Sequence, residues 1–184
     1  MNWLKSFLFL SHPYFSSMEF TTKLENFHTR LWTFHVKVPK DIAAYFLEKG
    51  IKRVVANLNN TVTFQCGLMP AGDGVYFINI NKKIRDQLKI KEGSKLNVTL
   101  NKDESAYGLP FPDELRELLE QDAEGNKLFH ELTPGKQRNM IYAVSQVKNV
   151  DLRIHRALVV IEHLKKNKGK INFRELYQEL HPKE

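Results

Sequence analysis

Two segments of the chain, residues 36–59 and 78–101, carry the same pattern of apolar positions at a constant offset of 42 residues. Each segment reads as a strand, a short helix and a second strand, and the apolar positions coincide without a gap. The identities are few: Lys40/Lys82, Ile42/Ile84, Leu58/Leu100 and Asn59/Asn101. Two such units related by a pseudo-twofold axis can form a small closed barrel with a helix at each end, which hides the strand edges. A chance similarity between two amphipathic segments is the alternative.

Alternation of apolar and polar residues predicts the strands of this region. In the first of them Trp32, Phe34, Val36 and Val38 alternate with polar residues. The run Gly72-Asp73-Gly74 reads as a hairpin turn rather than as a loop that approaches a ligand. Strands are expected over residues 32–38, 53–58, 61–68, 75–80 and 95–100, and short helices over residues 40–48 and 82–88.

After Asp103 the apolar spacing becomes helical. Residues 109–112 contain two prolines and predict a stiff connector to an acidic helix over residues 113–120. Thr133-Pro134 predicts a helix start, with a capping hydroxyl and a proline at the first helical position. Asp151 is expected to cap the next helix, and a last short helix is expected over residues 173–180. The apolar stripe of the helix after Asp151 comprises Ile154, Ala157, Leu158, Ile161 and Leu164.

These patterns predict an α+β protein: a small β-barrel capped by short helices, followed by a C-terminal helical region. We expect residues 1–17 to be a non-structural extension, residues 18–106 the barrel domain and residues 107–184 the helical region. The apolar run at residues 3–10 is too short to span a bilayer and has no clear cleavage site, so we expect no transmembrane segment. The single cysteine, Cys66, lies in an apolar run that predicts a buried, inert thiol and a reducing, cytoplasmic location.

The positive charge is concentrated in the last third of the chain. The formal net charge is +7, with an isoelectric point near 9.4. Residues 1–132 hold 17 Lys and Arg against 16 Asp and Glu, a balance of +1, whereas residues 133–184 hold 11 against 5, a balance of +6. A basic surface of this kind favours acidic partners, such as an acidic protein or nucleic acid.

The second half resembles the YdeI/OmpD-associated family, also called bacteriocin-protection proteins. The resemblance is carried by the run Phe129–Arg138, with its Thr-Pro-Gly-Lys-Gln-Arg turn into a helix, and by Lys148, Arg153 and Arg156 after it. The chain departs from the family pattern at Val150-Asp151-Leu152, where a Glu-Thr pair usually precedes the first arginine. The family has no settled biochemical activity, and its name implies a protective or stress-related association.

The front half resembles a small domain of unknown function that often precedes that tail. The matching residues are Arg53-Val54, Phe64, Leu68-Met69-Pro70, Gly72-Asp73-Gly74 and Lys82-Lys83-Ile84-Arg85, with Gly93 before the final strand. Members of that group are similar to double-split β-barrels capped by helices. The resemblance therefore implies a double-split-like barrel, in agreement with the repeat.

No arrangement of catalytic residues stands out. The sequence contains no Gly-x-Ser-x-Gly elbow, no phosphate-binding glycine-rich loop, no His-Glu-x-x-His helix and no Cys-x-x-Cys pair. His155 and His163 lie two turns apart on one expected helix, too far to share a metal ion, so we interpret them as solvated or partly packed. We expect no catalytic residue, no metal and no cofactor, and we favour a protein that is not an enzyme.

Five basic residues are the candidate contact surface for an anion or a nucleic acid: Lys136, Arg138, Lys148, Arg153 and Arg156. Lys136 lies in the first turn of a helix, where free N–H groups and the helix dipole favour anions. Arg153 and Arg156 are one turn apart, so their guanidinium groups can converge on one phosphate or carboxylate. The alternative is that these arginines pair with internal carboxylates, including those of the acidic helix at residues 113–120.

Three functions remain open. The leading one is a non-enzymatic stress or protection protein with a basic helical contact surface, which could form a homodimer. The second is nucleic-acid binding, mainly to the phosphate backbone, because few aromatic residues, Phe129 and Tyr142, accompany the basic cluster as platforms on which bases could stack. The third is a small-molecule site between barrel and helical tail.

Overall fold

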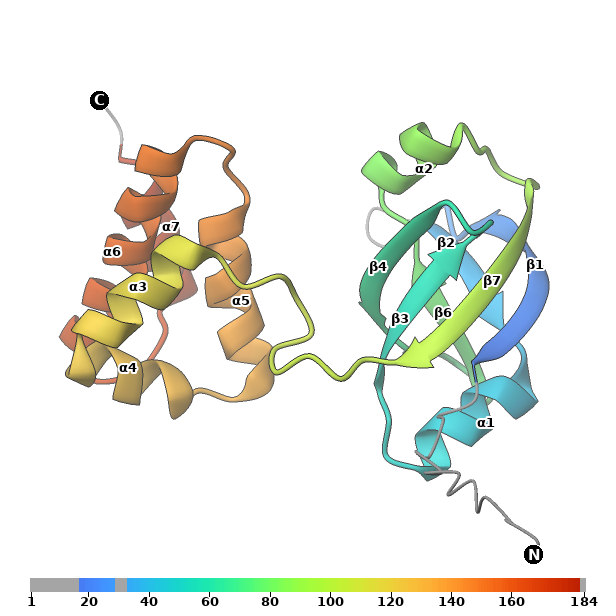
Figure 1. The fold of residues 1–184 in the computed structure, drawn as a ribbon, viewed down its shortest axis with the longest axis horizontal. Helices are drawn as coiled ribbons and strands as arrows, with labels where there is room; N and C mark the ends of the chain where they lie inside the picture. Colours follow the sequence, from blue (N-terminus) through green and yellow to red (C-terminus); the bar gives the residue numbers. More distant parts are fainter. Residues whose placement is uncertain (1–16, 29–32, 183–184) are drawn as a thin grey trace, which may run out of the picture. The chain divides into compact units, whose positions relative to one another are not determined.

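A computed structural model describes residues 17–28 and 33–182. The chain divides into two compact units, the first ending at Glu104 and the second beginning at Ser105. We call the first unit the barrel domain and the second the helical domain, and describe each by itself (Figure 1). Within the described residues, no helix is both long and apolar enough to cross a membrane.

The barrel domain is one curled antiparallel sheet with two short helices. In sheet order its strands are β4 (Val62–Gly67), β3 (Arg53–Leu58), β7 (Lys95–Lys102), β1 (Met18–Asn26), β2 (Phe34–Val38), β6 (Val75–Asn79) and β5 (Met69–Gly72). Only Leu68 separates β4 from β5, so the two ends of the sheet order are consecutive in the chain. Figure 1 shows α1 (Lys40–Glu48) and α2 (Lys82–Leu88) at opposite ends of the curled sheet. The predicted α+β class with a helix-capped barrel is confirmed.

The strand registers agree with the repeat seen in the sequence. Val36 on β2 faces Ile78 on β6, and Asn57 on β3 faces Thr99 on β7. The two residues of each pair are 42 positions apart, so each residue faces its own counterpart in the other half. A pseudo-twofold axis therefore passes through both pairs. The first predicted strand begins at Phe34, and Trp32 lies outside the described residues.

Two bent strands close the sheet, and they follow a different offset. Residues 18–23 of β1 pair with β7, whereas Leu24 and the residues after it pair with β2. At Leu68 the chain changes in the same way from pairing with β3 to pairing with β6. The amide of Leu24 donates to the carbonyl of Ser94, and the amide of Leu68 donates to the carbonyl of Lys52, at 2.9 and 3.0 Å. Leu24 and Leu68 are thus equivalent and buried, although they lie 44 rather than 42 residues apart.

The core of the barrel domain is formed by the side chains on one face of each long strand. On β3 and β7 every second side chain is buried, as the alternation in the sequence predicts. Cys66 lies in this core, and burial raises the pKa of its thiol to about 12 because the thiolate would lose its solvation. Burial thus disfavours the reactive thiolate, and the prediction that Cys66 is buried is confirmed.

The helical domain is arranged around its longest helix. It consists of α3 (Asp113–Gln121), α4 (Ala123–His130), α5 (Pro134–Ser145), α6 (Val150–Lys166) and α7 (Phe173–Leu180). Helix α6 packs against each of the other four. The largest fully buried side chains of this domain are Leu115, Phe129, Met140, Ile141 and Ile161.

The observed N-terminal ends of the helices correct three details of the sequence prediction. Pro134 is the first residue of α5 as predicted, but the hydroxyl of Thr133 makes no capping hydrogen bond. The cap of α6 is Asn149, whose side chain accepts from the amide of Leu152, so the prediction that Asp151 caps this helix is wrong. Helix α4 was not predicted, and its cap is Asp122, which accepts from the amide of Gly125 at 2.8 Å.

The predicted apolar stripe of α6 is only partly buried. Ala157, Ile161 and Leu164 lie in the core of the helical domain, whereas Ile154 and Leu158 each keep 45% of their surface exposed. The helical periodicity identified the residues of one broad face correctly. It could not show that the neighbouring helices cover only part of that face.

We predict equal roles for the two equivalent leucines of the barrel domain. Leu24→Ala and Leu68→Ala each remove a buried side chain at a bend, and each should lower the free energy of unfolding by about 2–5 kcal/mol. Chemical denaturation measures both values, and Glu19→Ala on the exposed face of β1 is the control with little expected effect. A large loss for one leucine and none for the other would contradict the equivalence.

Candidate functional site

Arg153 faces α3 and has a carboxylate partner. Its Nε and Nη2 atoms both lie 2.7 Å from Oε1 of Glu114, and its Nη1 donates to the carbonyl of Lys148 at 3.0 Å. The Glu114 side chain is 13% exposed and the Arg153 side chain 27%. Hydrogen bonding from Arg153 holds the pKa of Glu114 below its ordinary value of 4.5 and raises that of Arg153. This ion pair fixes α3 on α6.

Arg156 is half-buried, and its contacts are of a different kind. Its Nη1 donates to the carbonyl of Ala143 on α5 at 3.0 Å, and its Nη2 lies 3.2 Å from Nε2 of His181. Both partners are neutral when the imidazole is unprotonated. Within residues 17–28 and 33–182, no carboxylate lies within ion-pair distance of Arg156. The guanidinium therefore keeps its positive charge uncompensated at short range.

The other three predicted residues lie on α5 and in the loop after it. Lys136 is exposed in the first turn of α5, and Lys148 is exposed between α5 and α6. Arg138 is half-buried and engaged in a contact of its own. Arg153 and Arg156 contact different partners, so the structure does not bring their guanidinium groups onto one described partner. The role of all five as a contact surface stays a prediction.

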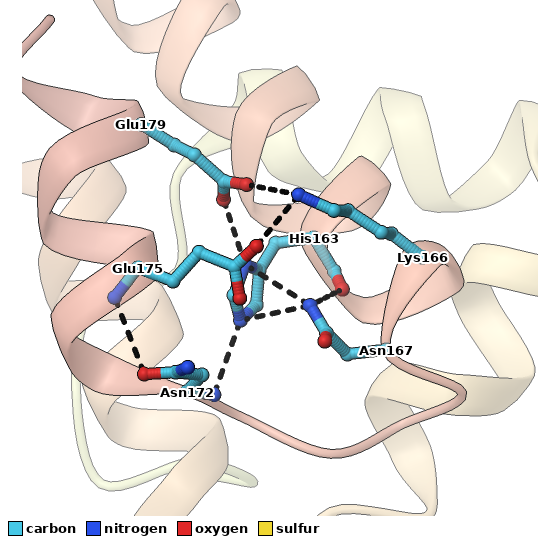
Figure 2. A network of polar contacts seen from close by, with 6 residues as sticks. All are labelled: His163, Lys166, Asn167, Asn172, Glu175 and Glu179. Atoms are coloured by element: carbon cyan, nitrogen blue, oxygen red, sulfur yellow. Dashed lines mark hydrogen bonds and ion pairs between the residues drawn. The ribbon is translucent and has the colours of Figure 1, made fainter.

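Helix α7 is held on α6 by a buried histidine that the sequence interpretation left as solvated or partly packed. Figure 2 shows His163 between Glu179 and Asn172. Its Nε2 accepts from the amide of Asn172 at 3.2 Å, so in the neutral ring the proton is on Nδ1, which lies 2.7 Å from Oε2 of Glu179. The side chain is 0% exposed. The position of His163 beside Val160 and Leu164, on the apolar face of α6, is the sequence signal that could have identified it as buried.

A lysine completes this network at the surface. Lys166 lies 2.6 Å from Glu175 and 3.2 Å from Glu179, so one ammonium group joins two carboxylates of α7 (Figure 2). The amide of Glu175 in turn donates to the side chain of Asn172, which caps α7. The position of α7 relative to α6 is thus set by polar contacts as well as by the buried Leu176.

A groove lies between α5 and α7, with Arg156 of α6 in its lining. Its volume is about 380 Å³. Three aromatic side chains in it are largely exposed: Tyr142 at 59%, Phe173 at 52% and Tyr177 at 66%. The remaining lining residues are Asn139, Met140, Ala143, Gln146, Arg156, Leu176, Leu180 and His181. We call this the α5–α7 groove.

The lining of the α5–α7 groove combines a cation with apolar surface. Among the described lining residues, Arg156 is the permanent charge, His181 supplies an imidazole, and none is a carboxylate. The ring of Tyr177 stacks on that of His181 at 4.5 Å. Such a lining can bind an anionic group beside an apolar or aromatic one. No group of three or more metal-ligating side chains occurs among the residues that the structure describes.

Comparisons with known families divide the chain in the same order as the fold. Residues 20–100 match the family model described as a domain of unknown function, DUF1905. Residues 109–167 match the family model described as bacteriocin-protection, YdeI or OmpD-associated. A comparison with curated proteins found no match. Helix α7, which forms one wall of the α5–α7 groove, lies beyond the second matched segment.

The buried histidine gives a prediction for α7. His163→Leu should leave the amide of Asn172 and the carboxylate of Glu179 without their buried partner, at a cost of about 1–3 kcal/mol. Hydrogen exchange of the α7 amides should then become faster by roughly tenfold or more. The matched control is His155→Leu, an exposed histidine on the same helix. Unchanged exchange in the His163 variant would show that the apolar contacts alone hold α7.

The Glu114–Arg153 ion pair gives a prediction of pH dependence. Because the pKa of Glu114 is below 4.5 in the folded chain, its ionised form stabilises the fold above that pH, and this stabilisation is lost as pH falls through the folded pKa. Glu114→Gln should therefore lower the thermal unfolding midpoint at neutral pH but not at strongly acidic pH. Glu117→Gln on the same helix is the control. A difference that persists in acid would contradict an electrostatic origin.

Proposed function

Because the chain carries a DUF1905 domain followed by a bacteriocin-protection, YdeI or OmpD-associated domain, we propose that it is a protection or stress-type protein that acts by binding. The contact surface is the α5–α7 groove of the helical domain, and its partner is an acidic segment of another protein. The single buried cysteine supports a reducing, cytoplasmic setting.

The observation that carries the proposal is the state of Arg156. A half-buried guanidinium normally gains a carboxylate partner, as Arg153 does with Glu114. The contacts of Arg156 with Ala143 and His181 orient the group without neutralising it. A carboxylate from a partner would gain a charge-assisted hydrogen bond to a guanidinium whose position is already fixed.

The apolar lining favours a peptide segment as the occupant. Tyr142, Phe173 and Tyr177 supply exposed aromatic surface beside Arg156, and aromatic and arginine residues are enriched at the centres of protein interfaces. The floor is formed by the buried side chains of Met140 and Leu176. An acidic segment with apolar neighbours would place a carboxylate on Arg156 and its apolar side chains among the aromatic rings.

Single-stranded nucleic acid is the second candidate, and the same aromatic residues favour it. Bases can stack on exposed tyrosine and phenylalanine rings, and Arg174 lies near Tyr177 and His181. Binding along a phosphate backbone nevertheless requires several cations spaced along the strand. The α5–α7 groove itself offers Arg156 as its one permanent charge among the described lining residues. We therefore favour the acidic peptide.

The test uses the full chain and two labelled probes, a synthetic peptide of alternating glutamate and leucine and a single-stranded oligonucleotide of mixed sequence. Fluorescence anisotropy should show binding of the peptide. Arg156→Ala and Tyr177→Ala should each raise its Kd by roughly tenfold. Lys136→Ala and Lys148→Ala, which remove exposed cations outside the groove, should leave it nearly unchanged.

Two outcomes would contradict this function. Absence of binding to the acidic peptide would overturn it directly. Binding of the oligonucleotide that falls steeply with added salt, and that weakens equally on removal of Lys136, Lys148 or Arg156, would assign the surface to nucleic acid instead. Because Tyr177 is largely exposed, its variant should keep the thermal stability of the parent chain and separates a binding effect from a folding effect.

A further inference from the structure

A second apolar surface lies on another face of α6. Val150, Ile154 and Leu158 follow one another at intervals of four residues and expose 51%, 45% and 45% of their surface. Residues four apart lie on the same side of a helix, so the three side chains form one stripe about two turns long. The described helices of the domain leave this stripe uncovered.

The stripe forms one wall of a groove with α3. The groove has a volume of about 360 Å³ and is lined on α6 by the stripe and Ala157. On α3 the lining residues are Asp113, Glu114, Glu117, Leu118 and Gln121. The ion pair between Glu114 and Arg153 holds the two helices together at one end. We call this the α3–α6 groove.

The charge of the α3–α6 groove is opposite to that of the chain. Among the described residues, three carboxylates line it and no cation does, although the net charge of the chain is +7. Arg153 neutralises Glu114 from outside the lining. Asp113 is 89% exposed, lies 3.7 Å from Arg116 and also interacts electrostatically with Arg153, and Glu117 has no ion pair with a described residue. Two carboxylates therefore stay available beside the apolar stripe.

We propose that the α3–α6 groove binds a basic amphipathic helix of a partner protein. The groove between two packed helices accepts the side chains of a third helix at spacings of three and four residues. The apolar face of that helix would cover Val150, Ile154 and Leu158. Its lysine or arginine side chains would pair with Asp113 and Glu117, and the carboxylates would reject an acidic helix of the same shape.

A second copy of this chain fits the α3–α6 groove less well than a basic partner. A twofold contact would place the same patch on both sides of the interface, so Asp113 and Glu117 would face the carboxylates of the other copy. Like charges that face each other in an interface weaken association. The negative charge of the groove therefore favours a different protein that carries positive charge.

This inference does not depend on the proposed function of the α5–α7 groove. The described residues that line the two grooves are different, and the charges of the grooves are opposite. If the experiment contradicts the proposal for one groove, the proposal for the other groove is unaffected.

The experiment titrates the full chain with a labelled synthetic helix of about five turns, built from leucine on one face and lysine on the other. An analogue with glutamate in place of lysine is the matched probe. The lysine helix should bind and the glutamate helix should not. Asp113→Lys combined with Glu117→Lys should weaken binding of the lysine helix by roughly tenfold or more, and Leu158→Asp should do the same by making the stripe polar. Arg156→Ala, in the α5–α7 groove, is the control without effect.

Three results would overturn the inference: no binding of the lysine helix, equal binding of both helices, or full affinity in both groove variants. Sedimentation of the chain without a probe tests whether a second copy of the chain occupies the α3–α6 groove instead. A dimer that dissociates in the Leu158→Asp variant would assign the stripe to a second copy and would likewise overturn it. The affected positions are exposed, so the variants should keep the circular dichroism of the parent chain.

Discussion

The packing of α6 against its four neighbours is the constraint on which the helical domain depends. Its buried face supplies the apolar core, and it also contacts each neighbour through at least one polar side chain. Arg153 binds Glu114 of α3, Lys165 binds the α4 cap Asp122 at 2.9 Å, Arg156 binds the carbonyl of Ala143 on α5, and His163 binds Glu179 of α7. Apolar packing tolerates sliding and rotation, whereas these directional contacts fix the angle and register of each helix. The shape of both grooves follows from that arrangement.

The four contacts differ in how far they compensate the charge of the side chain on α6. Three of them join a cation or histidine to a carboxylate, so the charge is compensated within the domain. The contact of Arg156 with a carbonyl and an imidazole leaves a positive charge beside exposed aromatic rings, while α3 retains Asp113 and Glu117 beside exposed aliphatic side chains. A single helix thus separates two surfaces of opposite sign. Net charge, which sums over the whole chain, conceals this division.

Sequence reasoning succeeded where the signal is periodic. The offset of 42 residues between apolar positions predicted the helix-capped barrel, and the pairs Val36–Ile78 and Asn57–Thr99 follow that offset. It missed the equivalence of Leu24 and Leu68 because the two bent strands are 44 residues apart, which a constant offset cannot register. Arg156 was named as a candidate, but its contact with His181 joins residues 25 positions apart, one on α6 and the other directly after α7. Contacts of that kind arise from packing between helices and produce no periodic pattern in the sequence. The exposure of Ile154 and Leu158 could not be predicted for the same reason.

The pairing of Val36 with Ile78 and of Asn57 with Thr99 has a consequence for the origin of the barrel domain. A segment that forms hydrogen bonds with its own duplicate across a twofold axis has the geometry of a symmetric dimer. The barrel domain therefore has the geometry that duplication and fusion of a symmetric dimer would produce. Two halves that are covalently linked in this way can keep one architecture while few of their residues are identical.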